Sequence, residues 1–441
     1  MASIERETMR MTHFDLKYGK STLGLDVPEQ RLVHVIEGAP YEALDNIETA
    51  VVEALNNPVG TAPLNVIVNA GETVCIVVSD ITRAWLRYDL FLPAVVNYLN
   101  EAGIPDENIF LLIAYGAHRL QTEAECRMEF GDEIVNRLRI EHSSGINPDS
   151  KFVHLGNTSH GGPIEINELA VNADRVILTG AIMYHSMAGF GGGRKAVLPG
   201  ISSYAAIQRN HCLCLGPNQG DGISEAAVSG NISATNLMHQ DQVEHASALD
   251  ADFLINVVLN AEDKIARLVC GHWDDAWHEG TELVNQIYGV SIDELADCVV
   301  VTPGGYPKDI NLYQALKAQE NAIKACKPGG VVIMLMELED INEPADFMKW
   351  FNIKDLYDRE KTLREGFTVP GFVALLFGEA LEQYHHILVT LEDNKAYEDT
   401  LGLPIVTTVE EAIELATKYL GKEDFTITVM PQGSNTMPIL K

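Results

Sequence analysis

Short apolar runs alternate with amphipathic segments in the first part of the chain. The runs are TVCIVVSD, NIFLLIAYG, RVILTG and FLINVVLN, each almost entirely apolar and rich in β-branched residues. Such runs are typical of strands in a parallel sheet that is covered on both faces. Residues 89–102 have the spacing of a helix, and Thr122 with Glu125 forms a capping-box pattern that opens another. This order predicts βαβ units and a doubly wound sheet.

The segments on either side of this region have their own patterns. Near the N-terminus, THFDLKYGKSTLGLDVP predicts a hairpin with its turn at YGKS, and residues 41–56 have helical spacing. After a helical segment at residues 277–287, a second series of strands is expected at CVVVTPGG, GGVVIMLME, HHILVTLE and PIVTT. The helices of this series are expected at residues 311–325 and 410–420.

The two series predict an α/β protein of two domains, each with a mainly parallel sheet flanked by helices. We expect the active site in the cleft between the domains. The predicted division is an N-terminal cofactor-binding domain of residues 1–275 and a C-terminal domain of residues 276–441. The tail, residues 422–441, is expected to add a strand that packs either on its own domain or back on the N-terminal one.

Composition narrows the class of protein. The chain of 441 residues has 31 basic and 63 acidic residues and a net charge of −32. Such an acidic chain argues against nucleic-acid binding, and an anionic substrate would need a local cluster of cations. The segment MASIERETMRM has charges where a signal peptide needs an apolar core, and no apolar run approaches the roughly 18 residues of a membrane span. With seven cysteines in no disulfide-like spacing, we expect a cytoplasmic protein without membrane contact.

Polar residues gather where the predicted strands end. Successive runs lead into SDITR, GAHR, MYH and YPKD, and the last is followed by LYQALK. Ligands of open α/β sheets bind outside the carboxyl ends of the strands, where these residues lie. The pattern therefore predicts a binding site at these ends. Its candidate residues are Asp80, Arg83, His118, His185 and Lys317.

The stretch HSMAGFGGGRKAVLPG, from His185 to Gly200, resembles neither standard phosphate loop. A GxGxxG motif needs a helix that opens at its third glycine, and a P-loop needs Ser or Thr where Ala196 follows Lys195. Its glycines would still let backbone amides approach a phosphate closely, and Lys195 would add positive charge. Arg194 would either contact that phosphate or be solvated. From the residues alone, the stretch predicts a phosphorylated cofactor or substrate.

Several of these residues also have a purely structural interpretation. Asp80 or Ser79 would cap a helix that begins at Ile81. A histidine after a strand is often a satisfied loop residue, and His211 after SSYAAIQRN would suit the dipole at a helix end. The residues alone leave these alternatives open.

The motifs SDITR, YGAHR, HSMAGFGGGRK, a later NH and LYQALK resemble, in this order, those of the nickel-pincer lactate racemase family. The spacings are the specific part, with ten residues from His185 to Lys195, sixteen from Lys195 to His211 and three from Asp80 to Arg83. The resemblance covers nearly the whole chain. It implies an isomerase, a racemase or epimerase that inverts C2 of lactate or a related 2-hydroxy acid. The implied chemistry is reversible hydride transfer through a 2-keto acid.

In that family the cofactor is nickel held by pyridinium-3-thioamide-5-thiocarboxylic acid mononucleotide, the nickel-pincer nucleotide. The resemblance implies that Lys195 is its covalent attachment point and that His211 is a nickel ligand. Asp80 would also orient a neighbouring basic group or histidine. The other implied partners are cofactor-biosynthesis proteins for maturation and a small 2-hydroxy acid. The residues implied to contact the nucleotide are Ser79, Asp80, Gly191, Gly192 and Gly193.

By the same resemblance, His118 and His185 are the paired acid/base catalysts, one for each face of the substrate. The planar fork of Arg83 suits the substrate carboxylate, and we expect Arg83, Lys195 and Lys317 to converge in one cationic pocket. An aromatic residue of the C-terminal domain would lie near the substrate, with Phe377 and Trp350 as candidates. The implied substrate-binding residues are Arg83, Tyr313, Gln314 and Lys317.

Two other functions stay open. An NAD-dependent 2-hydroxy acid oxidoreductase would need a better GxGxxG motif than the chain offers. A non-catalytic protein that binds nickel or a phosphometabolite would not depend on His118 and His185.

Overall fold

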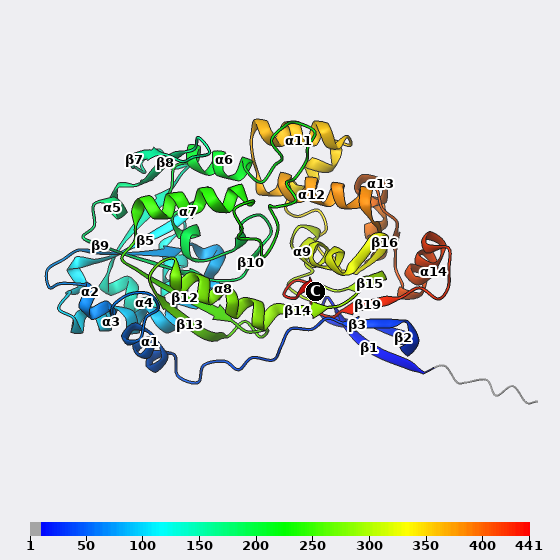
Figure 1. Cartoon of the computed structure of the whole chain (residues 1–441), viewed down its shortest axis with the longest axis horizontal. Coiled ribbons are helices and arrows are strands. Elements are labelled where there is room, and N and C mark those ends of the chain that lie inside the picture. The colour runs from blue at the N-terminus through cyan, green and yellow to red at the C-terminus, as the bar shows by residue number, and fades with distance from the viewer. Residues whose placement is uncertain (1–9) are drawn as a thin grey trace, which may run out of the picture. The chain divides into compact units, whose positions relative to one another are not determined.

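The computed structural model describes residues 10–441, and the charged segment at residues 1–9 lies outside the described residues. The chain divides into two compact units (Figure 1). Residues 40–287 form one unit, and the residues before 40 join residues 288–441 in the other. This corrects the predicted division at residue 275, because the helix expected at residues 277–287 belongs to the first unit and the N-terminal segment belongs to the second.

The unit of residues 40–287 is built on a six-stranded sheet with the order β13-β12-β9-β4-β5-β6. All neighbours are parallel except β12 and β13. The four apolar runs of the first series are the adjacent strands β12, β9, β4 and β5, as predicted. The strands are β4 (Val74–Ser79), β5 (Ile109–Gly116), β6 (Arg139–Ser144), β9 (Arg175–Ala181), β12 (Phe253–Leu259) and β13 (Ile265–Gly271).

Helices α1 (Ile47–Asn56), α3 (Tyr88–Glu101) and α4 (Glu123–Arg137) pack on one face of this sheet and form an apolar core with it. Each fully buried aliphatic side chain there contributes about 1.5–3 kcal/mol. The capping box of Thr122 and Glu125 is confirmed at the start of α4. Helix α1 begins later than predicted because the Asn46 side chain accepts a hydrogen bond from the Thr49 amide and caps it there.

The remaining elements of this unit include the short helix η4 (Gly193–Ala196), which contacts β4 and β9. Helix α6 (Tyr204–Cys212) packs against α7 (Leu237–Leu249), and α7 also contacts η4 (Figure 1). The others are α2 (Leu64–Ile67), η2 (Ile81–Leu86), η3 (Asp106–Asn108), α5 (Glu168–Val171), α8 (Asp275–Tyr288) and the antiparallel pairs β7 (Phe152–Asn157) with β8 (Pro163–Asn167) and β10 (Tyr184–His185) with β11 (Gly189–Phe190).

The second unit contains a fully parallel six-stranded sheet with the order β18-β17-β16-β15-β19-β3. Its strands are β3 (Leu32–Val35), β15 (Ala296–Val301), β16 (Cys326–Leu335), β17 (His385–Val389), β18 (Ile405–Val406) and β19 (Ile427–Met430). Its helices are α9 (Leu312–Ala322), η5 (Ile323–Ala325), α10 (Ala345–Met348), η6 (Lys349–Asn352), α11 (Leu356–Glu365), α12 (Val369–Gln383), η7 (Glu392–Tyr397), α13 (Glu398–Leu401) and α14 (Val409–Leu420).

Both chain ends complete this second unit. The predicted hairpin is confirmed as β1 (Met11–Tyr18) and β2 (Ser21–Pro28), and a short helix η1 (Glu29–Arg31) leads from it to β3. In the tail, β19 lies between β15 and β3, and β20 (Met437–Leu440) pairs with β14 (Gly289–Ile292). The tail therefore packs on its own unit, and the alternative that it packs on the N-terminal domain is wrong.

The fold class is confirmed, since both units have mainly parallel sheets flanked by helices. The placement of the active site between the domains stays a prediction. Within residues 10–441, we find no helix with both the length and the apolar character needed to cross a membrane.

Candidate active site

The ends of β4 and β5 bring Asp80 and His118 together. Asp80 is 3% exposed, and its Oδ2 accepts a hydrogen bond from His118 Nδ1 at 2.6 Å. Its Oδ1 accepts from the Thr82 hydroxyl at 2.5 Å, and Arg83 Nη1 lies 3.1 Å from the same hydroxyl. One buried carboxylate thus links the arginine and the histidine. Asp80 does precede η2, but its side chain makes no capping hydrogen bond, so the interpretation of Asp80 as a helix cap is wrong.

The charge of Asp80 follows from these contacts. Burial alone would raise the pKa of its carboxyl group, but the hydrogen bond from His118, the Thr82 hydroxyl and the charge of Arg83 together lower it below its usual value. Asp80 is therefore an anion at neutral pH. Because His118 uses Nδ1 for this bond, its exposed ring has Nε2 for other chemistry, and the carboxylate stabilises the protonated ring.

His185 has a different environment. It ends β10, and its Nδ1 lies 3.3 Å from the backbone amides of both Met187 and Ala188. Amides only donate, so Nδ1 is the acceptor and the neutral ring carries its proton on Nε2. The two predicted acid/base histidines thus have opposite tautomers. His118 offers an acceptor at Nε2, and His185 offers a donor.

The glycine-rich stretch is folded tightly on its own unit. The amide of Gly191 donates to the Met183 carbonyl at 2.7 Å, and that of Gly193 donates to Asn256 Oδ1 at 2.8 Å. Gly192 and Gly193 have φ of +68° and +50°, and a Cβ on them would overlap Asn256 and Trp277 respectively. These glycines are needed for close packing. Contact of Gly191, Gly192 and Gly193 with a nucleotide stays a prediction, and the amides of Gly191 and Gly193 already have protein acceptors.

The prediction that Arg194 contacts a phosphate or is solvated is wrong. Its side chain is 1% exposed, forms an ion pair with Asp274 and lies over the Trp277 ring at 3.9 Å from the centroid. Nη1 also lies 3.2 Å from His239 Nε2. Arg194 is therefore a buried support beneath the loop that carries Lys195.

Lys195 and His211 are electrostatic neighbours. Burial and the charge of Arg83 lower the pKa of the partly buried Lys195 amine to about 7. Burial and the charge of Lys195 lower the pKa of His211 to about 4, so its ring is neutral. His211 Nδ1 donates to the Ile207 carbonyl at 2.8 Å, which directs Nε2 to other partners. A neutral ring is no cation for a helix dipole, so that alternative is wrong.

Ser79 lies at the end of β4. Its amide donates to the Tyr88 hydroxyl at 2.8 Å, and this hydroxyl lies 2.9 Å from Thr179 Oγ1. The end of the strand is thereby fixed to α3 and β9. Contact of Ser79 with a nucleotide stays a prediction.

The other predicted residues lie on α9 of the second unit. Lys317 Nζ donates to Gln314 Oε1 at 3.1 Å, and the Asn311 side chain accepts from the Gln314 amide and caps the helix. The Tyr313 ring packs against Phe347 with centroids 5.4 Å apart. The spacing puts Tyr313, Gln314 and Lys317 on one side of α9. Their convergence with Arg83 and Lys195 stays a prediction.

Two aromatic residues are candidates for a position near the substrate. The prediction is wrong for Phe377, because its side chain is 1% exposed and packs in the core between Phe351 and His386. Trp350 is partly exposed and lines a cavity of about 520 Å³ with Ile353 and Pro370. Its position near a substrate stays a prediction.

Sequence reasoning missed the residues that support the loop, namely Asn256, Asp274 and Trp277. Asn256 gave a usable signal, since it is a single polar residue inside the apolar run FLINVVLN. Trp277 donates from Nε1 to the Gly191 carbonyl at 2.9 Å. In the segment WDDAWH, the spacing of the tryptophans and aspartates does not indicate that Asp274 and Trp277 support the glycine-rich loop.

A histidine and an arginine linked by a carboxylate, together with a partly buried lysine near a neutral histidine, define an α/β enzyme with acid/base groups and cations at its strand ends. Residues 18–222 match the lactate racemase N-terminal domain, and residues 292–437 match the lactate racemase C-terminal domain. The chain belongs to the lactate racemase family and is an isomerase.

Similar proteins span almost the whole chain. The lactate racemase of Thermoanaerobacterium thermosaccharolyticum is 32% identical over 431 residues, which cover 96% of this chain and 98% of that protein. The lactate racemase of Lactiplantibacillus plantarum is 32% identical over 435 residues, covering 96% and 99%. The structure of the T. thermosaccharolyticum lactate racemase apoprotein matches with a TM-score of 0.85 at 31% identity and covers 97% of this chain and 100% of that one. A Thermotoga maritima protein, at 18% identity and a TM-score of 0.61 over 91% of this chain and all of that one, shares the fold.

Gly193→Ala is expected to lower the free energy of unfolding by about 3 kcal/mol, because the added Cβ overlaps Trp277 and φ is positive. Gly161→Ala is the matched control, since Gly161 has φ +77° with no atom within 4 Å of its Cβ. The free energy of unfolding of Gly161→Ala should fall by only about 1 kcal/mol. Equal losses in denaturant unfolding would contradict the packing role.

Lys195→Met is expected to stabilise the apoprotein at pH 7. The folded chain binds fewer protons than the unfolded chain between the folded pKa of about 7 and the ordinary lysine value of 10.5. Stability therefore rises with pH across this window, and the variant loses that rise. Denaturant unfolding at pH 7 and 9 measures it, with the exposed Lys264→Met as control. The same pH slope in Lys195→Met as in the unchanged protein would show the amine to be normally charged.

Proposed function

We propose that the protein inverts C2 of a 2-hydroxy acid, lactate or a close relative, with the nickel-pincer nucleotide attached to Lys195. The observation that carries this proposal is the partly buried Lys195 amine, with its lowered pKa, beside the neutral ring of His211. The relatives named lactate racemase, which match 96% of the chain, support the choice of substrate. The proposal includes maturation by cofactor-biosynthesis proteins and a cytoplasmic location.

The residues present fit this cofactor. An amine with a pKa of about 7 is about half neutral at pH 7, and the neutral form is a nucleophile for covalent attachment. Among residues 10–441, no carboxylate forms an ion pair with Lys195. His211 matches a metal ligand whose other ring nitrogen donates to a backbone carbonyl, the usual arrangement for metal-binding histidines. When bound, the nickel nucleotide would supply a reversible acceptor for the hydrogen on C2.

Substrate binding would fall to the cations. Arg83 would hold the carboxylate, because a guanidinium can bind both carboxylate oxygens and the Thr82 hydroxyl and carbonyl already orient one of its nitrogens. Gln314 and Lys317, joined on α9, would complete the carboxylate site, and Tyr313 would line it.

Proton transfer at the substrate hydroxyl would fall to the two histidines. His118 would take the hydroxyl proton at Nε2, and Asp80 would stabilise the resulting imidazolium. His185 would present its Nε2–H to the oxygen from its own side. For the opposite enantiomer to use His185 as the base, its proton would first have to move from Nε2 to Nδ1, which would release the amides of Met187 and Ala188.

The decisive experiment combines intact mass with a substrate screen. Protein from a host that makes the nucleotide should carry an adduct on Lys195 and exchange the enantiomers of lactate or of another 2-hydroxy acid in a screen with malate, phenyllactate and sugar acids. Lys195→Ala should lose both the adduct and the exchange. An unmodified Lys195 from such a host would overturn the proposal, and so would NAD-dependent activity that persists in Lys195→Ala.

His118→Gln and His185→Gln should each lower kcat by about 10²–10⁴-fold, because each removes a group that moves the hydroxyl proton. Both should keep the adduct mass. His154→Gln, at an exposed histidine on β7, is the control and should keep full activity. Full exchange in either active-site variant would contradict the acid/base role of the histidine that it replaces.

A further inference from the structure

His211 is fixed to the helix that carries it. Its Nδ1 bonds to the Ile207 carbonyl one turn earlier in α6, so the ring follows any movement of this helix. The apolar cluster at α6 is small and contains only Leu198, Ala206 and Ile207 among its buried members. The place of His211 therefore depends strongly on polar contacts.

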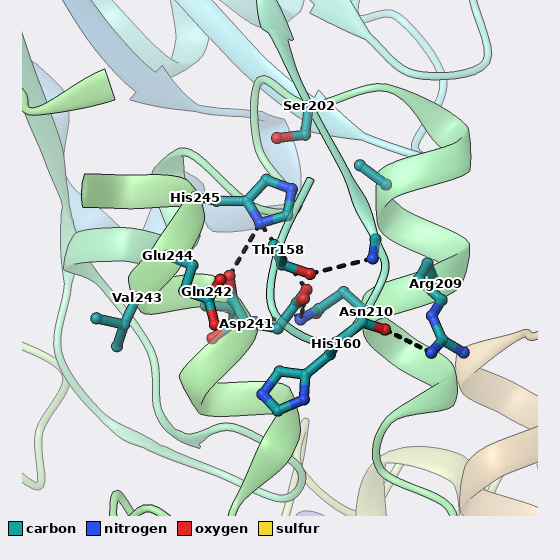
Figure 2. Close-up of polar contacts among 12 residues, drawn as sticks. Thr158, His160, Ser202, Arg209, Asn210, Asp241, Gln242, Val243, Glu244 and His245 are labelled. Carbon is teal, nitrogen blue, oxygen red and sulfur yellow. Dashed lines mark hydrogen bonds and ion pairs between the residues drawn. The ribbon is translucent and has the colours of Figure 1, made fainter. Parts of the chain in front are cut away.

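These polar contacts come from Asn210, which is fully buried. Its Nδ2 donates to the Met238 carbonyl and to Asp241 Oδ2, both at 2.9 Å, and its Oδ1 accepts from Gln242 Nε2 at 3.4 Å. All three partners belong to α7, and Figure 2 shows Asn210 directed at Asp241. One side chain, next to His211 in sequence, thus attaches α6 to α7.

Asp241 is an unusual partner for this bond. It is fully buried, and its Oδ1 has no hydrogen-bond partner in the described part of the chain. His245 lies beside it, with Nδ1 3.8 Å from Oδ2 (Figure 2). The two ring nitrogens of His245 lie 2.9 and 3.1 Å from the carbonyls of Asp241 and Pro163, so the ring is held on both sides.

A buried carboxyl group with an unpartnered oxygen is a poor way to gain stability, because the loss of its contacts with water is only partly offset. Its hydrogen bond from Asn210 does fix the position of α6 on α7. The same helix also holds the Lys195 loop, since the Asn236 side chain at its start donates to the Met187 carbonyl and His239 contacts Arg194. Helix α7 is therefore a common support for Lys195 and His211.

We propose that Asp241 is a positioning residue. Through Asn210 it holds α6 on α7 and so sets the place of His211 relative to Lys195. This inference rests on the proposed function, in which His211 binds nickel, and it assigns the support of that ligand to a buried carboxylate on another helix.

The test compares Asp241→Ala and Asp241→Asn with Glu244→Gln. Glu244 lies on the same helix but accepts hydrogen bonds from Ser159, so it fixes α7 without a hydrogen bond to Asn210. All three proteins should carry the Lys195 adduct. After dialysis against a chelator, Asp241→Ala should retain about tenfold less nickel per adduct, as metal-supporting residues do. Asp241→Asn, which keeps an oxygen for Asn210, should retain more, and Glu244→Gln should equal the unchanged protein.

The inference would be overturned if Asp241→Ala and Glu244→Gln retained equal amounts of nickel per adduct, whether both variants keep the metal or both lose it. If Asp241→Ala does not fold, Asn210→Ala replaces it, with nickel loss expected and nickel retention as the contrary result.

A separate measurement keeps the inference distinct from the proposed function. If the unchanged protein carries no adduct, the proposed function fails, and the positioning role is then measured in the apoprotein by NMR of ¹⁵N-labelled histidine. The His211 signal, identified by its loss in His211→Gln, should shift in Asp241→Ala and stay in place in Glu244→Gln. An unchanged signal in Asp241→Ala would overturn the positioning role.

Discussion

The close packing of Gly192 and Gly193 against Asn256 and Trp277 determines where Lys195 lies. No side chain fits at either glycine, so the loop approaches the sheet more closely than other residues would allow. The approach leaves Arg194 beneath the loop, and its burial would be costly without the ion pair to Asp274 and the Trp277 face. Once these contacts form, η4 has one position, and the lysine is held at the end of a rigid turn instead of on a mobile loop.

This rigidity explains how an acidic protein keeps a reactive cationic site. The net charge of −32 surrounds the site with a negative field, yet burial and Arg83 lower the pKa of Lys195. Burial also keeps His211 neutral. Desolvation thus leaves the His211 ring neutral and the Lys195 amine only partly charged at pH 7, while the positive charge of Arg83 lies near the carboxylate of Asp80.

Period and position along the sequence predicted the most apolar strands and the polar residues at their ends, but not the less apolar strands β6 and β13 of the same sheet. Four apolar runs became neighbouring strands, and Asp80 and His118, on two of their ends, lie within hydrogen-bond distance. What the pattern could not supply was the partner of each polar side chain. Arg194 looked solvated or phosphate-bound because a buried arginine depends on Asp274 and Trp277, far along the chain. The unit boundary was misplaced for the same reason, since β3 pairs with β19 across almost the whole sequence.

Helix α7 shows how far the support of a site extends beyond the groups that face a ligand. Its first turn is tied to the loop after His185 through Asn236, its next residues to Arg194 through His239, and its middle to α6 through Asp241. None of these side chains lies at a strand end. The rule that ligands bind outside the carboxyl ends of the strands therefore does not predict them. They share burial and hydrogen bonds to other elements, and a change at any of them alters the distance between groups that it never touches. In the proposed function the metal ligand His211 and the covalent anchor Lys195 lie on separate elements, and this common helix would hold their geometry.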